Sequence, residues 1–442
     1  MVATSARGQR SGAAPVVRAR WALWTFVVVN AAIVEVLFLT GGTGKNDVLT
    51  VAKFFGLHAA LVLICQLLLV ARLPWLDRRI GMDRLTSWHR WVGFGLLWTI
   101  LVHATLVVLG YAVLDDAPMG TTFLALAGVP ASLMGMLAAT VVVVIGVVST
   151  RGVRRRLRYE TWHGLHLLLY LALGLAFAHQ LIETTTFKSS AVAFAYWWAL
   201  WLFAFGSLVA GRVVVPLLRN ARHQFRVAAV VPESHDVVSV YVTGRHLERL
   251  PALAGQFFVW RFPGHHHWWQ ANPFSLSAAP NGRSLRLTAK AVGTASAGLR
   301  TLPVGTRAFL EGPYGAFTSL HRSRPGVVLI AGGVGVTPVR ALLEEHTPGD
   351  FVVLYRVRDE RDAVLLTELR QLIAARRGRL HLLTGRGARP FEPDALRHLV
   401  PDITQRDVYV CGPPAMTSAV LAGLRALKVP NRQVHAEKFS LA

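Results

Sequence analysis

Histidines recur inside the long apolar stretches in the first half of the chain. An ionisable side chain is costly in hydrocarbon, so each of these histidines is a candidate functional group. His89 and His103 are 14 residues apart on one stretch, which on a helix leaves them about 40° from a common face and about 21 Å apart along the axis. Two haem irons stacked across a bilayer need that arrangement, with a matching pair of histidines on a facing helix. Six histidines fall in or at the edges of apolar stretches: His58, His89, His103, His163, His166 and His179.

The matching pair is expected on the apolar stretch at 160–182. His166 and His179 would be separated by about 19.5 Å of helical rise, whereas His163 and His179 would be separated by about 24 Å. The first value is closer to the rise between His89 and His103, so His166 is the better ligand. Ideal helical geometry leaves the side chains of His166 and His179 about 140° apart, which predicts a π-bulge or a skewed haem. We therefore expect metal ligation by His89, His103, His166 and His179.

The sequence also allows other roles for membrane histidines. A lone histidine more often makes a helix–helix hydrogen bond, and several histidines can relay protons. His58 has no mate at a matching spacing, so we expect it to make an interhelical hydrogen bond. We expect His163 beside a haem rather than on its iron.

Membrane-spanning helices are the elements that must position these histidines. Of the 442 residues, 53% are hydrophobic and only 16% are charged, whereas an ordinary soluble chain is about a quarter charged. The two cysteines, Cys65 and Cys411, exclude a disulfide framework and a cysteine zinc site, and the absence of CxxCH excludes c-type haem. About 20 apolar residues span a bilayer, and six stretches qualify: 21–40, 51–71, 90–114, 130–149, 160–182 and 190–216.

The arginines predict the orientation of these spans. Positive residues favour the cytoplasmic side, and they gather before the first span and after the second, fourth and sixth, whereas the alternate loops hold only Lys45 and Lys188. Both termini are therefore expected in the cytoplasm, and the net charge of +23 is attributed to a membrane face rather than to nucleic acid binding. The first span exceeds the 7–15 residues of a signal-peptide core and no A-x-A site follows it, so we expect it to be retained. The arginines are Arg7, Arg10, Arg18, Arg20, Arg72, Arg78, Arg79, Arg84, Arg151, Arg154, Arg155, Arg156, Arg158, Arg219 and Arg222.

The pattern of apolar and turn-forming residues changes near residue 217. Short β-like runs separated by Pro, Gly and Asn predict a small antiparallel barrel; they are Gln224–Val231, Val237–Thr243, Gln256–Arg261, Phe274–Ala278 and Ser284–Ala289. From about residue 325, strands alternate with helices, which predicts a parallel, doubly wound α/β sheet. The expected strands are Val327–Ile330, Phe351–Tyr355 and Val408–Cys411, with a helix through Ala341–Glu345.

Three motifs in the barrel region contain residue types that can hold a flavin. The sequence NPFS at 272–275 supplies an aromatic ring to lie beside the isoalloxazine and a hydroxyl to lie near its N5 atom. The sequence KAVGTAS at 290–296 precedes a short helix, where backbone N–H groups can face a pyrophosphate. EGPYG at 311–315 closes the barrel. These motifs predict FAD.

Two further motifs predict a nicotinamide dinucleotide. VVLIAGGVGVTP at 327–338 places glycines between a strand and a helix, where a phosphate can approach the backbone. This signal alone is weak, because it is not GxGxxG. VYVCGPP at 408–414 ends a strand at the carboxyl edge of the sheet, where ligands bind in open α/β folds. Cys411 alone would suggest an inert buried thiol, but its place after the other motifs predicts a nicotinamide contact.

The order of these motifs resembles the ferredoxin–NADP reductase superfamily. With the paired histidines, residues 20–442 resemble bacterial members of the ferric reductase / NADPH oxidase superfamily. The resemblance implies FAD, NADPH or NADH, and two haem b groups in a multi-pass protein of the bacterial plasma membrane. It divides the chain into a cytoplasmic segment at 1–20, a six-helix transmembrane di-haem domain at 21–217, an FAD-binding β-barrel at 218–322 and a Rossmann-like NAD(P) domain at 323–442.

The resemblance also assigns site residues. Catalytic roles fall on Ser275, Cys411, Glu437 and Phe439, with Phe439 covering the flavin where the nicotinamide must enter. The haem ligands are again His89, His103, His166 and His179. Cofactor contacts are assigned to Asn272, Pro273, Phe274, Ser275, Ser277, Lys290, Gly293, Ser296, Gly332, Gly333, Gly335, Thr337, Pro338, Cys411, Gly412, Pro413 and Phe439.

Some residues depart from the family pattern. Asn272 replaces an often basic pyrophosphate contact, which predicts weaker retention of FAD or substitution by Arg261. The tract His265–His267 is either a solvated loop or a metal site. Val107 stands where the eukaryotic oxidases have a further outer histidine, which weakens the case for a dedicated oxygen pocket. Lys53 either meets a haem propionate or extends to the membrane interface.

The expected function is transfer of electrons from cytoplasmic NAD(P)H through FAD and two b-type haems to oxygen, giving superoxide, or to a ferric chelate at the outer face. Arginine at the end of the second Rossmann strand accommodates a 2′-phosphate, so Arg356 and Arg386 favour NADPH over NADH. The lipid bilayer is the expected partner, and no obligate protein partner is implied. The alternatives are a reductase or membrane cytochrome b that feeds a separate electron carrier, and a transporter or proton channel.

Overall fold

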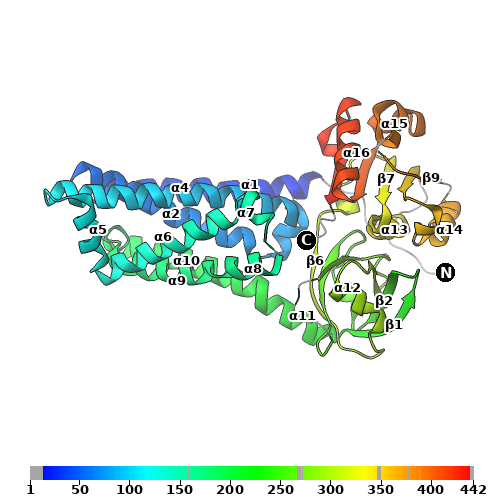
Figure 1. The fold of residues 1–442 in the computed structure, drawn as a ribbon, viewed down its shortest axis with the longest axis horizontal. Helices are drawn as coiled ribbons and strands as arrows, with labels where there is room; N and C mark the ends of the chain where they lie inside the picture. The colour runs from blue at the N-terminus through cyan, green and yellow to red at the C-terminus, as the bar shows by residue number, and fades with distance from the viewer. Residues whose placement is uncertain are drawn as a thin grey trace. The chain divides into compact units, whose positions relative to one another are not determined.

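The computed structural model describes residues 13–157, 159–265, 270, 272–345, 350–376, 378–387 and 389–438. These residues form two compact units, which are treated separately below. One unit comprises residues 20–73 and 83–212 and is helical; the other comprises 13–19, 74–82 and the described residues from 213 onward and contains the sheets (Figure 1). Arg7, Arg10, Arg158, His266, His267 and Phe439, which carry sequence-based expectations, lie outside the described residues.

Six helical segments in the described residues are long and apolar enough to cross a membrane. They correspond to the six predicted spans, and several are apolar around their whole circumference, as expected of helices in lipid. Three short helices, α3, α5 and α7, were not predicted. The helices are α1 (Ala13–Thr40), α2 (Asp47–Val70), α3 (Pro74–Ile80), α4 (Met82–Leu114), α5 (Met119–Ala127), α6 (Pro130–Val148), α7 (Arg151–Arg154), α8 (Tyr159–Leu167), α9 (Leu169–Glu183), α10 (Ala191–Val209) and α11 (Val215–His223).

Helix pairs build the core of the first unit. α6 packs along α9, and α2 packs along α10. Buried tryptophans of α10 fill the second contact, where the ring of Trp197 stacks on Phe187 at 3.7 Å. Asn46 caps α2 by accepting a hydrogen bond from the Leu49 amide, and its own amide donates to the Gly110 carbonyl of α4. The cap therefore ties the start of α2 to α4.

The fifth span is interrupted at Leu168, between α8 and α9. There the Leu168 amide bonds to the Leu165 carbonyl at 3.0 Å, three residues back. The irregularity is thus a tightened turn, and the π-bulge expected between His166 and His179 is wrong. A tightened turn advances roughly 120° per residue instead of 100°. The deviation rotates His179 toward the face of His166 but absorbs only part of the mismatch, since each residue of the turn adds about 20°.

The second unit begins with two three-stranded antiparallel sheets that surround one core. Their strand orders are β1-β2-β5 and β4-β3-β6. Isolated bridges link the sheets, between Arg226 and Arg307 and between Leu276 and Leu287. This is the predicted antiparallel barrel, with its hydrogen bonding interrupted between the two sheets. The strands are β1 (Arg226–Pro232), β2 (Val237–Thr243), β3 (Phe257–Arg261), β4 (Asn272–Ser275), β5 (Ser284–Lys290) and β6 (Phe309–Tyr314), with the short helix α12 (Thr294–Gly298) after β5.

A five-stranded parallel sheet of order β11-β10-β7-β8-β9 follows. Alternate residues of its strands enter different cores: Leu329 packs with α13 and α14, and Ile330 packs with α15 and α16. The helices therefore cover both faces (Figure 1), which explains the continuous apolar runs of these strands. The elements are β7 (Val327–Gly332), α13 (Val336–Glu345), β8 (Phe351–Arg356), α14 (Leu366–Arg376), β9 (Arg379–Leu383), α15 (Pro393–Leu399), β10 (Asp407–Gly412), α16 (Pro414–Ala426) and β11 (Val434–Lys438).

Candidate functional site

His89 of α4 and His166 of α8 face each other inside the helical unit. Their ring centres are 6.2 Å apart, with the ring planes at 71°. The Nδ1 atoms of both rings are buried and have no hydrogen-bond partner among the described residues. Two imidazole nitrogens each about 2 Å from one metal ion would hold the ring centres about 6 Å apart. The distance between the two rings therefore fits one metal ion, such as a haem iron, held between them.

His103 of α4 and His179 of α9 form the second pair and lie close enough for their charges to interact. Nδ1 of His103 lies 2.8 Å from the Ala52 carbonyl, and Nδ1 of His179 lies 2.8 Å from the Ala131 carbonyl. A carbonyl can only accept a hydrogen bond, so each Nδ1 carries the proton. Each Nε2 then keeps its lone pair, which is the arrangement found in metal-ligating histidines.

Glycines make room for both rings of the second pair. A Cβ at Gly56 of α2 would lie 2.8 Å from Cε1 of His103, and a Cβ at Gly135 of α6 would lie 3.0 Å from Nδ1 of His179. Only glycine allows the two neighbouring backbones to approach the rings this closely. α2 and α6 thus supply both the carbonyl acceptors and the space that fix these rings.

His58 and Lys53, two other polar residues of the helical unit, have structural partners. Nδ1 of His58 lies 2.9 Å from the Phe54 carbonyl, and its Nε2 lies 3.3 Å from Glu35 of α1, as expected of an interhelical contact. The sequence reasoning missed Glu35, which is one acidic residue within a long apolar run. The ammonium of Lys53 donates to the Gly41 and Gly42 carbonyls after α1, so it caps a helix end. His163 lies one helical turn before His166 and close enough to Arg72 and Arg212 to interact electrostatically with them.

The flavin motif forms β4, which pairs with β3. Phe274 stands opposite Phe258, and the Trp260 indole donates to the Phe274 carbonyl at 3.0 Å. The hydroxyl of Ser275 is buried and has no hydrogen-bond partner among the described residues. A buried hydroxyl without a partner is costly, and a ring nitrogen of a bound flavin would satisfy it. This residue therefore fits the role expected near N5.

Other residues assigned to FAD have protein partners. Asn272 donates to the Gln270 carbonyl, and the Lys290 ammonium lies 3.0 Å from Asp236. Burial opposes ionisation of Asp236, but Lys290 and Ser234 outweigh it and lower the pKa of Asp236. The Ser296 hydroxyl accepts from the Val292 and Gly293 amides at the start of α12. Ser296 therefore stabilises the backbone conformation of this loop.

Two further residues of the barrel have protein partners. The Ser277 hydroxyl, expected to contact the cofactor, accepts hydrogen bonds from Arg286 and Thr288. Arg261, expected to substitute for a basic residue at Asn272 unless FAD is held less tightly, pairs with Glu311. The cofactor roles of both residues stay predictions.

The two dinucleotide motifs meet at the carboxyl edge of the parallel sheet. A Cβ at Gly335 would lie 2.3 Å from the Cys411 carbonyl oxygen, and a Cβ at Gly332 would lie 2.9 Å from Pro413. A Cβ at Gly333 would meet nothing within 4 Å, and φ there is +53°. The glycines therefore serve two purposes, since Gly335 and Gly332 allow the motifs to pack and Gly333 leaves an open backbone turn.

The strand register brings further assigned residues to this edge. Glu437 of β11 pairs in register with Cys411 of β10, and Arg356 of β8 pairs with Gly332 of β7. The Arg356 guanidinium donates to the carbonyls of Thr384 and Gly387. It thereby holds the loop that carries Arg386, which is exposed. Arg356 is thus expected to act on the ribose edge partly through this loop.

Among the described residues, no cluster of three or more His, Cys, Asp or Glu side chains could hold a metal ion. His265, the described member of the histidine tract, has its Nε2 2.8 Å from the Gly298 carbonyl. The site therefore consists of paired histidines in the helical unit and a flavin–dinucleotide edge in the other unit. This combination defines an electron-transfer oxidoreductase that is a multi-pass membrane protein.

Comparison with known proteins specifies the class. Residues 55–177 match the family described as "Ferric reductase like transmembrane component", and residues 329–421 match "Oxidoreductase NAD-binding domain". The chain thus joins a segment similar to ferric reductase transmembrane components to a segment similar to oxidoreductase NAD-binding domains. The first match includes His89, His103 and His166, and His179 lies just beyond its end.

Curated relatives match the second half of the chain. The ferredoxin reductase component of 3-ketosteroid-9-alpha-monooxygenase from Mycobacterium tuberculosis is 34% identical over 203 residues, which is 43% of this chain and 56% of the relative. The flavohemoprotein of Vibrio cholerae is 32% identical over 181 residues, 38% of this chain and 45% of the relative. The chain therefore spans about half the length of these relatives. A solved structure, the FAD/NAD-binding domain of nitric oxide dioxygenase from Vibrio cholerae, is 27% identical with a TM-score of 0.43, covering 49% of this chain and 98% of that one.

Proposed function

We propose that this protein moves electrons across a membrane from cytoplasmic NAD(P)H, through FAD and two b-type haems, to oxygen or a ferric chelate at the outer face. The observation that carries the proposal is the pairing of four membrane histidines on α4 and α8–α9. His89 faces His166, and His103 lies near His179 with both Nδ1 protons given to carbonyls. Helical rise puts the two pairs about 20 Å apart along the bundle.

Residues of the sheet-containing unit would position the nicotinamide and the flavin for reaction. The buried Ser275 hydroxyl would donate to flavin N5, and Phe274 would lie beside the ring. Cys411 and Glu437, adjacent in register, would bound the nicotinamide pocket, and Phe439 would cover the flavin. When bound, FAD supplies conversion between hydride and single electrons, and the haems supply single-electron carriage through the bilayer.

The histidine assignment predicts a specific pattern of haem loss. His103→Leu should remove the outer haem while FAD and the inner haem remain, so NADPH should still reduce one haem equivalent but no impermeant external acceptor. His89→Leu should leave the outer haem bound but not reducible by NADPH. His58→Leu is the control and should keep both haems, because His58 contacts Glu35. Haem content per chain, reduced-minus-oxidised spectra and external acceptor reduction measure these outcomes. Full external activity of the His103 variant with unchanged haem content would contradict the assignment.

A reductase that feeds a separate carrier is the competing function. It would show flavin reduction by NADPH but no b-type absorbance band in the purified chain. Superoxide and Fe(II) formation, measured side by side in the same vesicles, would identify the acceptor.

A further inference from the structure

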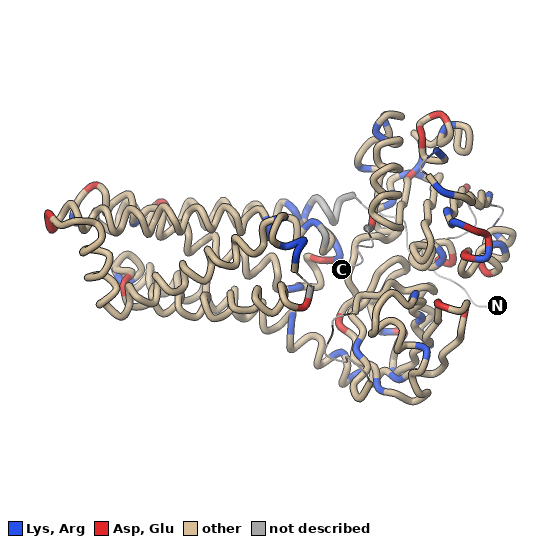
Figure 2. Tube along the Cα trace, viewed as in Figure 1, with Lys and Arg blue, Asp and Glu red and all other residues tan. Residues whose placement is uncertain are grey.

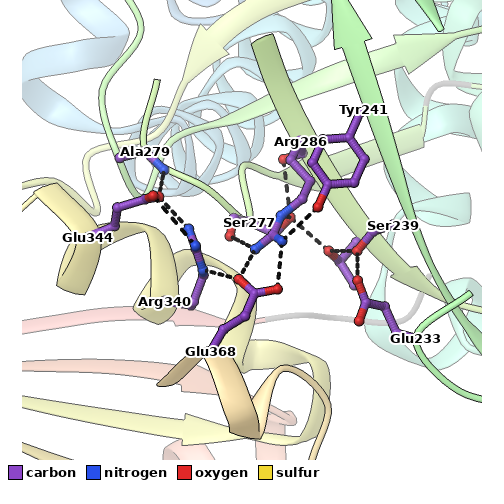
Figure 3. Close-up of polar contacts among 10 residues, drawn as sticks. Glu233, Ser239, Tyr241, Ser277, Ala279, Arg286, Arg340, Glu344 and Glu368 are labelled. Atoms are coloured by element: carbon purple, nitrogen blue, oxygen red, sulfur yellow. Dashed lines mark hydrogen bonds and ion pairs between the residues drawn. The ribbon is translucent and has the colours of Figure 1, made fainter. Parts of the chain in front are cut away.

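An ionic network with two buried arginines and two partly exposed carboxylates connects the flavin barrel to the dinucleotide domain within the second unit. It joins β5 and the segment after β4 to α13 and α14 (Figure 3). Its four charged members, Arg286, Arg340, Glu344 and Glu368, are called the interdomain network below. The sequence reasoning missed all of them, because each has the appearance of an ordinary surface charge on a strand or helix.

Arg286 uses every hydrogen-bond donor of its guanidinium, which has five. Its Nε donates to the Ser277 hydroxyl at 3.1 Å, and Nη2 donates to the Ser277 carbonyl at 2.7 Å. Nη1 donates to the Tyr241 hydroxyl at 3.1 Å, and Nη1 and Nη2 together grip both Glu368 oxygens at 2.9 and 3.0 Å. The side chain is only 4% exposed. The barrel residues therefore fix the orientation of the Arg286 side chain. Its two terminal nitrogens face Glu368 of α14.

Arg340 binds the two carboxylates of the dinucleotide domain, Glu344 and Glu368. Its Nε donates to Glu368 at 2.8 Å, and its Nη1 pairs with Glu344 one turn along α13. Glu344 in turn accepts from the Ala279 amide at 2.6 Å. Two carboxylates of the dinucleotide domain, aligned by one buried arginine, thus bind two donors of the barrel, as Figure 3 shows. Burial opposes ionisation of Glu368, but Arg286 and Arg340 outweigh it and lower its pKa.

Stability alone does not account for such a network. Desolvating these charges costs about as much as their attraction returns, and well-packed apolar residues often do as well or better. A bidentate Arg–carboxylate pair differs from an apolar contact in its fixed geometry. The contacts also lie next to the reacting groups in sequence. Ser277 follows Ser275 by two residues, and Arg340 follows Gly335 by five.

We propose that the interdomain network positions the flavin strand against the dinucleotide turn and thereby sets the rate of hydride transfer. Arg286, Arg340, Glu344 and Glu368 are positioning residues, since none contacts the proposed flavin or nicotinamide site directly. The inference rests on the proposed function only for the reduction of FAD by NADPH, and it does not depend on the haems.

The test is single-turnover reduction of bound FAD by NADPH in the full-length, FAD-loaded protein. Glu368→Gln should slow flavin reduction about ten- to hundredfold, the range that a misplacement near 1 Å can produce. FAD content and the affinity for NADP+ should change little, while the charge-transfer absorbance of stacked nicotinamide and flavin should fall. Glu344→Gln is the second variant if the first fails to fold. It should slow flavin reduction less, because Arg286 keeps its two hydrogen bonds to Glu368.

The matched control is Glu360→Gln, which breaks an exposed ion pair with Arg370 of α14 at 3.1 Å and touches no barrel residue. It should leave the rate and the absorbance unchanged. Wild-type rates in both network variants, even with lowered thermal stability, would overturn the positioning role. Failure of the wild-type flavin to accept electrons from NADPH or NADH would instead overturn the proposed function.

Discussion

At the scale of single residues, neighbouring backbone fixes the rings of His103 and His179, the proposed ligands of the outer haem. His103 and His179 each give the Nδ1 proton to a carbonyl on another helix, which fixes the tautomer and leaves Nε2 as the basic nitrogen. The rings reach these carbonyls because glycines stand beside them. A ligand role for the histidines therefore makes Gly56 and Gly135 part of the site.

Gly56→Ala tests this dependence. A methyl group 2.8 Å from Cε1 of His103 must push the ring aside, and overpacking of this kind costs about 1–3 kcal/mol, or about a ten- to hundredfold weaker hold on the outer haem. Haem content should fall toward one per chain, and external acceptor reduction should fall with it. Gly174→Ala on α9 is the control, because nothing lies within 4 Å of its Cβ position. Equal haem retention in both variants would refute the packing argument.

Nucleotide preference also belongs to the residue scale. Arg386 is exposed on a loop that Arg356 holds through two carbonyls, near the strand end where a ribose 2′-phosphate would lie. Arg386→Ala should raise KM for NADPH about tenfold or more, since a hydrogen bond to a charged group is lost, and change KM for NADH little. Arg379→Ala, at the opposite end of β9, should alter neither. Equal kcat/KM for NADPH and NADH in the wild type would contradict the preference.

At the scale of elements, the dinucleotide edge depends on how closely β7 and β10 bring their motifs together. The turn after β7 packs on the end of β10 with no room for a side chain at Gly335. Parallel strands align their carboxyl ends at one edge, so the contact follows from the sheet order. The glycine motif is consequently a packing requirement as well as the proposed phosphate site.

Gly335→Ala and Gly333→Ala separate these two requirements. At Gly335 the new Cβ would lie 2.3 Å from the Cys411 oxygen, so the variant should lose about 1–3 kcal/mol of stability and its affinity for NADPH. At Gly333 the space is open and only the positive φ is strained, which costs about 1–2 kcal/mol. Thermal unfolding and NADPH titration should rank Gly335→Ala as the more damaging change. The reverse order would show that backbone conformation matters more than packing.

At the scale of the whole molecule, charge divides the helical unit along its length. Figure 2 shows Lys and Arg gathered at one end of the bundle. Arg72 follows the end of α2, Arg84 lies near the start of α4 and Arg151 begins α7. Asp47 and Glu183 lie at the opposite helix ends. Such asymmetry follows the positive-inside rule and favours a cytoplasmic position for the basic end.

Sealed vesicles of known orientation test this prediction. NADPH added outside should support reduction of an acceptor trapped inside inverted vesicles, because the basic end then faces outward. NADPH added outside right-side-out vesicles should have no effect until detergent opens the membrane. Detergent treatment of both preparations controls for enzyme content. Activity with the opposite sidedness would show that the orientation is reversed.

The spans, the strand–helix alternation and the spacing of the paired histidines could be predicted from the sequence, because composition and periodicity are local properties of the chain. The break at Leu168 could not be read from it, since an ideal helix gives only the size of the mismatch between His166 and His179. The roles of the two serines in the flavin motif also required the structure. Ser275 is left with a buried hydroxyl lacking a protein partner, whereas Ser277 is held by Arg286 and Thr288.

Only the tertiary structure placed Glu437 beside Cys411 and brought Arg286 to Glu368. These residues are far apart along the chain, and nothing local in the sequence distinguishes a buried, paired charge from a solvated one. Burial raises the free energy of an unpaired charge. The partners of such residues are therefore set when the sheets and helices pack. The partners of a buried charge are therefore a property of the fold, whereas the tendency to form each strand or helix is a property of the sequence.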